Sequence, residues 1–181
     1  ALGHAALYSN TTGSYNTAVG YVAGYSNTTG NENSAFGDAT LYYNTTGSNN
    51  TALGGGALYS NTTGNRNTAV GYETLKYNTT GNYNTAVGFQ SLYVNNTTAS
   101  YITAVGYQAG YNSTAAGSCF VGCASGYYTT GIGNTFVGGL DSGGYGYGAG
   151  YYNTTGTSNT AVGSGAFQTN TTGGSNTVVG Y

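Results

Sequence analysis

Asparagine-threonine-threonine triplets are the commonest groups in this chain with a recognisable chemistry. Asn-x-Thr/Ser is the acceptor pattern for N-linked glycans on secreted chains, and a coat of sugars would keep so weakly charged a chain soluble. Alternatively, the asparagines form turns and their amides stack in a hydrogen-bonded ladder. The candidate acceptors are Asn10, Asn27, Asn44, Asn61, Asn78, Asn95, Asn96, Asn112, Asn153 and Asn170.

Groups that could support catalysis are too dispersed to form an active site. The run from Asp141 to Gly144 is similar to the nucleophile loop of serine proteases, with Ser142 as the nucleophile. A triad also requires a histidine beside the serine and an acid that orients it. The only histidine is His4, many repeats away. We therefore expect no enzyme activity and no cofactor.

The remaining reactive side chains give no metal site. Acidic residues are scattered singly, whereas metal sites need several ligands close together. Cys119 and Cys123 lie four residues apart, so a bridge between them would need a tight turn. They are expected to be small residues that fill their columns, or alternatively to form an interchain disulfide.

Composition excludes several partners. Charged residues make up 3% of the 181 residues, against roughly 25% in typical soluble domains. Two basic residues, Arg66 and Lys76, cannot neutralise a run of phosphates, so nucleic acid is not an expected partner. No apolar run approaches the roughly 20 residues that cross a bilayer, so we expect no membrane insertion. Lacking a signal peptide and an initiator Met, the sequence is expected to be an excerpt of a longer chain.

A 17-residue repeat organises the whole chain. Its ideal form is NTAVGYxALYxNTTGxx, and sequence varies between copies while the spacing persists, which a random Gly/Asn/Tyr-rich tract would not do. The glycine of the recurring Ala-Val-Gly serves as the anchor of each repeat, and the intervals between anchors predict that residues 1–181 form one array of about 11 coils, irregular around 139–152. The anchor glycines are Gly3, Gly20, Gly37, Gly54, Gly71, Gly88, Gly106, Gly122, Gly138, Gly163 and Gly180.

Each repeat predicts one coil of an all-β parallel β-solenoid, or β-roll. Asn-Thr-Ala-Val-Gly-Tyr is typical of a strand and Ala-Leu-Tyr of a second, shorter one. Asn-Thr-Thr-Gly predicts a turn, because Asn and Gly tolerate positive φ. Stacking such units puts equivalent positions about 4.8 Å apart, which makes a rod on the order of 50 Å long.

The residue before each anchor glycine is always large and apolar, and we expect it to face the coil interior. The preceding alanine must then face something dry, because successive strand residues point to opposite faces. The simplest cover is another copy of the chain, most simply in a trimer; the alternative is a lone solenoid with an exposed alanine stripe. The predicted core column is Val19, Phe36, Leu53, Val70, Val87, Val105, Val121, Val137, Val162 and Val179.

The recurring Asn-Thr-Ala-Val-Gly-x-x-Ala, as at Asn16 to Ala23 and in a variant from Asn67 to Thr74, resembles the head repeat of trimeric autotransporter adhesins. It is also similar to repeats of other bacterial surface proteins and of phage tail fibres. The resemblance implies a left-handed β-roll of three chains, displayed outside the cell or on a virion. Family members usually have shorter coils with Ser-Val-Ala-Ile-Gly at this point. The motif is structural, so it transfers no binding residue.

The sequence thus predicts a structural extracellular fibre segment that serves in display, spacing or attachment, with copies of itself and surface glycans as partners. The alternative is a glycan- or ice-binding module that uses columns of tyrosine or threonine. Tyrosines can stack on sugars, or instead pack along the ladder. The columns are Tyr8, Tyr25, Tyr42, Tyr59 and Tyr93, and Thr11/Thr12, Thr28/Thr29, Thr45/Thr46 and Thr62/Thr63.

Overall fold

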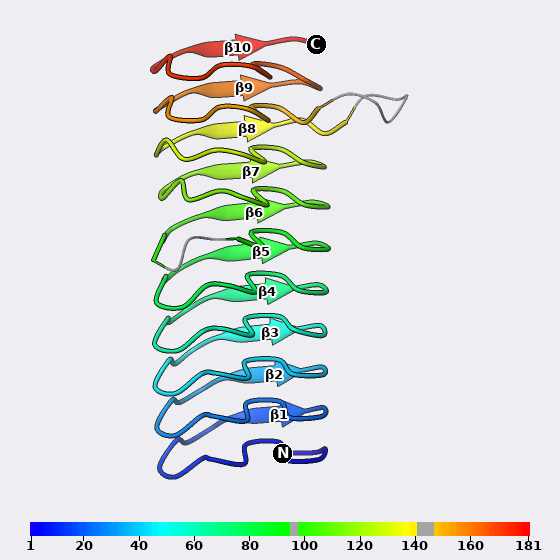
Figure 1. Cartoon of the computed structure of the whole chain (residues 1–181), viewed down its shortest axis with the longest axis vertical. Coiled ribbons are helices and arrows are strands. Elements are labelled where there is room, and N and C mark those ends of the chain that lie inside the picture. Colours follow the sequence, from blue (N-terminus) through cyan, green and yellow to red (C-terminus); the bar gives the residue numbers. More distant parts are fainter. Residues whose placement is uncertain (95–97, 141–146) are drawn as a thin grey trace.

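The chain folds as a stack of coils with one short strand per coil (Figure 1). The computed structural model describes residues 1–94, 98–140 and 147–181. Every strand has three residues, and neighbours in sequence are neighbours in the sheet. The strands are β1 (Thr17–Val19), β2 (Ser34–Phe36), β3 (Thr51–Leu53), β4 (Thr68–Val70), β5 (Thr85–Val87), β6 (Thr103–Val105), β7 (Cys119–Val121), β8 (Thr135–Val137), β9 (Thr160–Val162) and β10 (Thr177–Val179).

Equivalent repeat positions lie over one another along the entire stack. All neighbouring strands pair in parallel, and Thr51 pairs with Thr68 just as Thr68 pairs with Thr85. The register holds even where the spacing is irregular, because Thr135 pairs with Thr160 across 25 residues. The extra residues are accommodated between strands β8 and β9, so the sheet continues unbroken. This confirms the predicted parallel β-solenoid with coils of about 17 residues.

The predicted second strand is wrong. The Ala-Leu-Tyr segment is a series of turns, and its leucines adopt the left-handed conformation, with φ of 51° at Leu41 and Leu58 and 52° at Leu75. Left-handed backbone costs an L-residue about 1–2 kcal/mol. Full burial of a leucine side chain offsets that cost with about 1.5–3 kcal/mol. The leucine thus turns the chain back and fills the core at the same time.

The predicted core column is also wrong, because the two faces of the strand are exchanged. Alanine points inward, and Ala52, Ala69 and Ala86 are fully buried. The following large apolar residue points outward, where Leu53 is 43% exposed. The column facing outward, half-buried or exposed in every coil, is Val19, Phe36, Leu53, Val70, Val87, Val105, Val121, Val137, Val162 and Val179.

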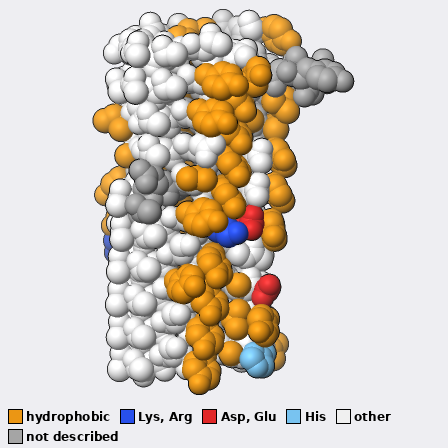
Figure 2. Space-filling view, in the orientation of Figure 1, with side chains coloured by type: hydrophobic (Ala, Val, Ile, Leu, Met, Phe, Trp, Pro, Cys, Tyr) orange, Lys and Arg blue, Asp and Glu red, His pale blue; other side chains and the backbone are white. Residues whose placement is uncertain are grey.

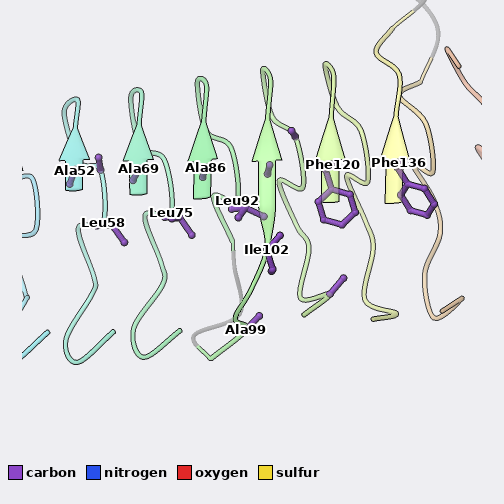
Figure 3. Close-up of a cluster of buried hydrophobic side chains, with 14 of the residues drawn as sticks. Ala52, Leu58, Ala69, Leu75, Ala86, Leu92, Ala99, Ile102, Phe120 and Phe136 are labelled. Atoms are coloured by element: carbon purple, nitrogen blue, oxygen red, sulfur yellow. The ribbon is translucent and has the colours of Figure 1, made fainter. Parts of the chain in front are cut away.

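Core volume explains this exchange. The inward strand residue and the leucine of the returning segment share one narrow interior, as Ala52 and Leu58 do in Figure 3. Small opposite large therefore fills most layers. Phe120 and Phe136 reverse the usual order, with the large residue on the strand, and both are fully buried. Their coils have glycine in place of the leucine, at Gly126 and Gly150, where any Cβ would overlap the phenylalanine ring.

The anchor glycine is required by two features at the end of each strand. Gly71 has a φ of 133°, a conformation open to glycine alone. A Cβ there would also lie 2.5 Å from the carbonyl oxygen of Gly88 in the next coil. The fixed period of Gly in the sequence therefore reports the close stacking of successive backbones.

Candidate functional site

The Asn-Thr-Thr asparagines form a ladder inside the solenoid. Asn61 is fully buried, and its Nδ2 donates to Oδ1 of Asn44 at 2.7 Å and to the Gly64 carbonyl oxygen at 3.0 Å. Asn44 donates in the same way to Asn27, at 2.7 Å. Each amide therefore closes its own turn and bonds the coil beneath, which is the ladder interpretation made from the sequence.

Glycosylation of this column is incompatible with the described fold. Asn27, Asn44, Asn61, Asn78 and Asn153 are at most 2% exposed, so an attached glycan would have to occupy the core. Only part-buried candidates remain on described residues, namely Asn10 and Asn170 in the ladder and Asn112 next to it. Asn95 and Asn96 lie outside the described residues.

A second buried ladder runs along the asparagine that precedes each strand. The backbone N–H of Asn67 donates to Oδ1 of Asn50 at 3.0 Å, while its Nδ2 donates to the Gly81 carbonyl at 2.8 Å. Ile102 and Ser118 interrupt this column, and the N–H of Ile102 still bonds Oδ1 of Asn84 at 3.0 Å. Two hydrogen-bonded polar ladders are thus buried together with the narrow Ala/Leu core.

The outward face of the sheet combines hydroxyl and apolar columns. Thr and Val stand on either side of the buried Ala in five of the ten strands, so the face repeats hydroxyl and apolar side chains at one-coil intervals. Cys119 occupies the Thr column between Thr103 and Thr135. Both it and Cys123 are free thiols, and burial raises the pKa of each. Cys119 thus fills its column with a small side chain, as expected, and an interchain disulfide stays a prediction.

The threonines of each Asn-Thr-Thr turn have different roles. The first uses its hydroxyl as a donor to the next coil's backbone, as Thr45 does to the Thr62 carbonyl at 3.1 Å. The second is exposed, as at Thr46 and Thr63. Of the two turn columns, the second therefore presents regularly spaced threonine side chains to solvent, as the strand threonines do on the outward face of the sheet.

The tyrosine column packs along the ladder. Successive rings from Tyr8 to Tyr59 stack with centroids 5.1–5.3 Å apart. Beyond Tyr59 the column is interrupted by Lys76 and resumes at Tyr93, which stacks on Tyr111 at 4.9 Å. Because most ring faces already contact neighbouring rings, a sugar cannot stack on them within the column. Figure 2 shows orange side chains gathered in bands beside a white polar side.

Where the repeat loses two outer side chains, the surface is hollowed. Gly55 and Gly56 stand where the coil on one side carries Asp38 and Ala39. The result is an open notch of about 370 Å³, within the ~300–1,000 Å³ of small-molecule sites. We call it the Gly55 notch; its lining residues are Asp38, Ala39, Gly55, Gly56, Tyr59, Tyr72, Glu73, Lys76 and Tyr77.

An ion pair fixes one wall of the Gly55 notch. Nζ of Lys76 lies 2.5 Å from Oε1 of Glu73, and Nε2 of Gln90 donates to Oε2 at 2.9 Å. Burial opposes ionisation of Glu73, but the bonds from Lys76 and Gln90 outweigh it, so the pKa of this carboxyl is lowered. The hydrogen bond to Glu73 raises the pKa of Lys76. The rings of Tyr77 and Tyr93 each lie 5.6 Å from the ammonium.

Sequence reasoning missed this notch because it searched for recurring residues, and the notch is a departure from recurrence. The available signal was the pair Gly55-Gly56, which replaces the aromatic residue and its neighbour that other coils carry at these positions. The pair lies one coil from Lys76, which interrupts the tyrosine column. The nucleophile-like run from Asp141 to Gly144 lies entirely outside the described residues. Within the described part of the chain, no three His, Cys, Asp or Glu side chains gather to hold a metal ion.

Comparison with known proteins assigns no family. No family model matches the chain, no curated protein matches it, and no solved structure matches it. Among the described residues there is also no helix with the length and apolarity to cross a membrane. Fold and function therefore rest on the geometry above.

Proposed function

We propose that this chain is a structural segment of an extracellular fibre, a stiff spacer for display or attachment at a cell or virion surface. One observation carries the proposal: ten parallel strands stack in register, and each coil buries its interior against the next. Such an array lengthens by about 4.8 Å per coil and gains stability from coil-on-coil contact. What such an array provides is a defined length.

The finer proposal is a left-handed β-roll in which three copies pack through the outward face of the sheet. The outward column is apolar in every coil and is opposite a buried alanine column. A sheet with apolar side chains on both faces is normally packed against other structure on both faces. The faces are exchanged relative to the sequence expectation, but the argument for a partner copy is unchanged, and the resemblance to autotransporter heads supplies the number three.

Lysine substitutions on the outward face test this assembly. We expect the chain to sediment as a trimer and the double variant Leu53→Lys, Val105→Lys to sediment as a folded monomer, because two charges would be desolvated in each interface. Asn49→Lys is the matched control, since Arg66 already holds the equivalent exposed position. A wild-type chain that is monomeric over the whole concentration range in analytical ultracentrifugation would refute the assembly.

A second candidate is binding to a regular surface such as ice. The observation that favours it is the exposed second-threonine column, which repeats at the coil spacing on a rigid frame. Inhibition of ice recrystallisation would be lost in Thr46→Lys, Thr63→Lys and kept in Asn49→Lys. Equal activity of both variants, or no activity in the wild type, removes this candidate.

A further inference from the structure

We propose that the Gly55 notch binds one neutral saccharide ring, stacked on Tyr72 and hydrogen-bonded to Asp38 and Glu73. This site does not depend on the chain being a fibre or on the number of chains in the assembly. It is a single position in an otherwise repetitive surface. The ligand class follows from the aromatic face, the polar groups and the charge that the notch combines.

The aromatic face is available because stacking stops at Gly55. Tyr72 stacks on Phe89 with centroids 5.6 Å apart. On the side of Gly55 the same ring borders the notch, since a Cβ built at Gly55 would be 3.5 Å from Cδ2 and 3.6 Å from Cε2 of Tyr72. The apolar C–H face of a pyranose can therefore occupy the place that the missing aromatic side chain would fill.

The polar groups surround that place on opposite sides. Asp38 and Tyr72 are equivalent residues two coils apart, which separates their levels by about 10 Å. A ring stacked on Tyr72 would direct hydroxyl groups at the Asp38 carboxylate, which is exposed and makes no hydrogen bond or ion pair within the described residues. On the other wall, Glu73 is held by Lys76, Gln90 and the Tyr72 hydroxyl.

The charged groups of the notch disfavour an anion and offer a neutral polyol partners for its hydroxyl groups. Asp38, Glu73 and Lys76 are half of the six Asp, Glu, Lys and Arg residues in the chain, and all three line this notch. Carboxylates accept hydrogen bonds and the ammonium donates them, so the walls present both kinds of partner to hydroxyl groups. Two carboxylates against one ammonium oppose an anionic ligand, and tetramethylammonium therefore serves as the competing cationic probe in the test.

The test uses the whole chain and a substitution that fills the notch. Methyl glycosides of glucose, galactose, mannose and N-acetylglucosamine are titrated by NMR, with tetramethylammonium as the cationic probe. We expect at least one glycoside to saturate with a dissociation constant of about 1–10 mM, as suits a ligand of this size. Gly55→Tyr restores the aromatic of the repeat and is expected to weaken binding at least about tenfold, roughly 1.4 kcal/mol.

Three further variants separate a site from a change of fold. Ser164→Tyr adds the same side chain at the equivalent position of a distant coil and should leave binding within about twofold. Asp38→Asn and Tyr72→Leu should each weaken binding while the circular dichroism spectrum is unchanged. The proposal is overturned if no glycoside saturates, if Gly55→Tyr binds as the wild type does, or if tetramethylammonium binds and the glycosides do not.

Discussion

At the scale of the residue, the interior of each coil is filled by a pair whose sizes compensate. Alanine on the strand meets leucine on the returning segment in four coils, and phenylalanine meets glycine in two. Two coils have small residues at both positions; in one of them, with Ala18 and Gly24, a cavity of only about 10 Å³ remains. Packing in this core is therefore decided by the pair, which makes the two positions energetically coupled.

The coupling can be measured at Phe120 and Gly126. Phe120→Ala should cost about 3–5 kcal/mol through the cavity it leaves. Gly126→Leu should cost at least about 1–3 kcal/mol, because the side chain overlaps the Phe120 ring. The double variant recreates an Ala/Leu pair, so urea unfolding should show a loss smaller than the sum of the two by at least about 1 kcal/mol. Additive costs would contradict the pairing, and Phe120→Ala with the distant Leu41→Ala supplies the additive control.

At the scale of the element, the asparagine ladders hold the turns of successive coils at a fixed spacing. Their repeat was visible in the sequence, and so was their capacity to form a ladder. Glycosylation was the competing interpretation because the acceptor pattern is local, whereas burial of Asn44 and Asn61 depends on the coil closing around them. The same limit applied to the strand: alternation shows that adjacent residues face opposite ways, but only the width of the coil decides that alanine faces inward.

A single oxygen-for-nitrogen exchange tests the ladder. In Asn61→Asp, a carboxylate oxygen would face Oδ1 of Asn44 and the Gly64 carbonyl, where the amide now donates. Loss of these bonds around a buried charge should cost about 3 kcal/mol or more at neutral pH. The cost should shrink in acid, because burial raises the pKa of the new carboxyl and protonation restores one donor.

Asn49→Asp is the matched control, since Asn49 is exposed and Asp tolerates its left-handed backbone. Thermal unfolding of the control should follow the wild type within about 0.5 kcal/mol. An Asn61→Asp chain as stable as that control at pH 7 would mean that this amide is not a buried donor.

At the scale of the whole molecule, the period was the part of the structure that the sequence defined best. The 17-residue spacing predicted parallel, in-register stacking, and the pairing of Thr51 with Thr68 confirms it. The left-handed leucines were not foreseen, since a segment rich in Leu and Tyr favours a strand by propensity. The Gly55 notch could not follow from the repeat at all, because it depends on a local loss of side chains.

The stacked tyrosines give the molecule a sensitivity to alkali. The hydrogen bond between Tyr93 and Tyr77, with burial, raises the pKa of Tyr93 to about 12. Burial raises the pKa of Tyr127 and Tyr151 to about 12 as well. Since an unfolded tyrosine ionises near pH 10, these groups keep their full contribution to stability below that pH.

Between about pH 10 and pH 12 the unfolded chain releases protons that the folded chain retains, so the free energy of unfolding should fall. Chemical denaturation across this range, with phenolate absorbance recorded in parallel, measures both effects. Tyr127→Phe should make the fall shallower. A stability that rises or stays level above pH 10 in the wild type would show that the rings ionise as freely as in the unfolded chain.

The distance between equivalent positions is the most direct test of the stacked coil. Spin labels are placed at Thr12 and at Thr80, Thr155 or Thr172, exposed residues four, eight and nine coils further on. Cys119 and Cys123 are replaced by Ser, which other coils carry at the same positions. The mean separations should be about 19, 38 and 43 Å, a constant 4.8 Å per coil. The solenoid would be contradicted by a Thr12–Thr80 separation of about 45 Å, as in a flexible chain of that length. Distances that do not increase coil by coil would contradict it as well.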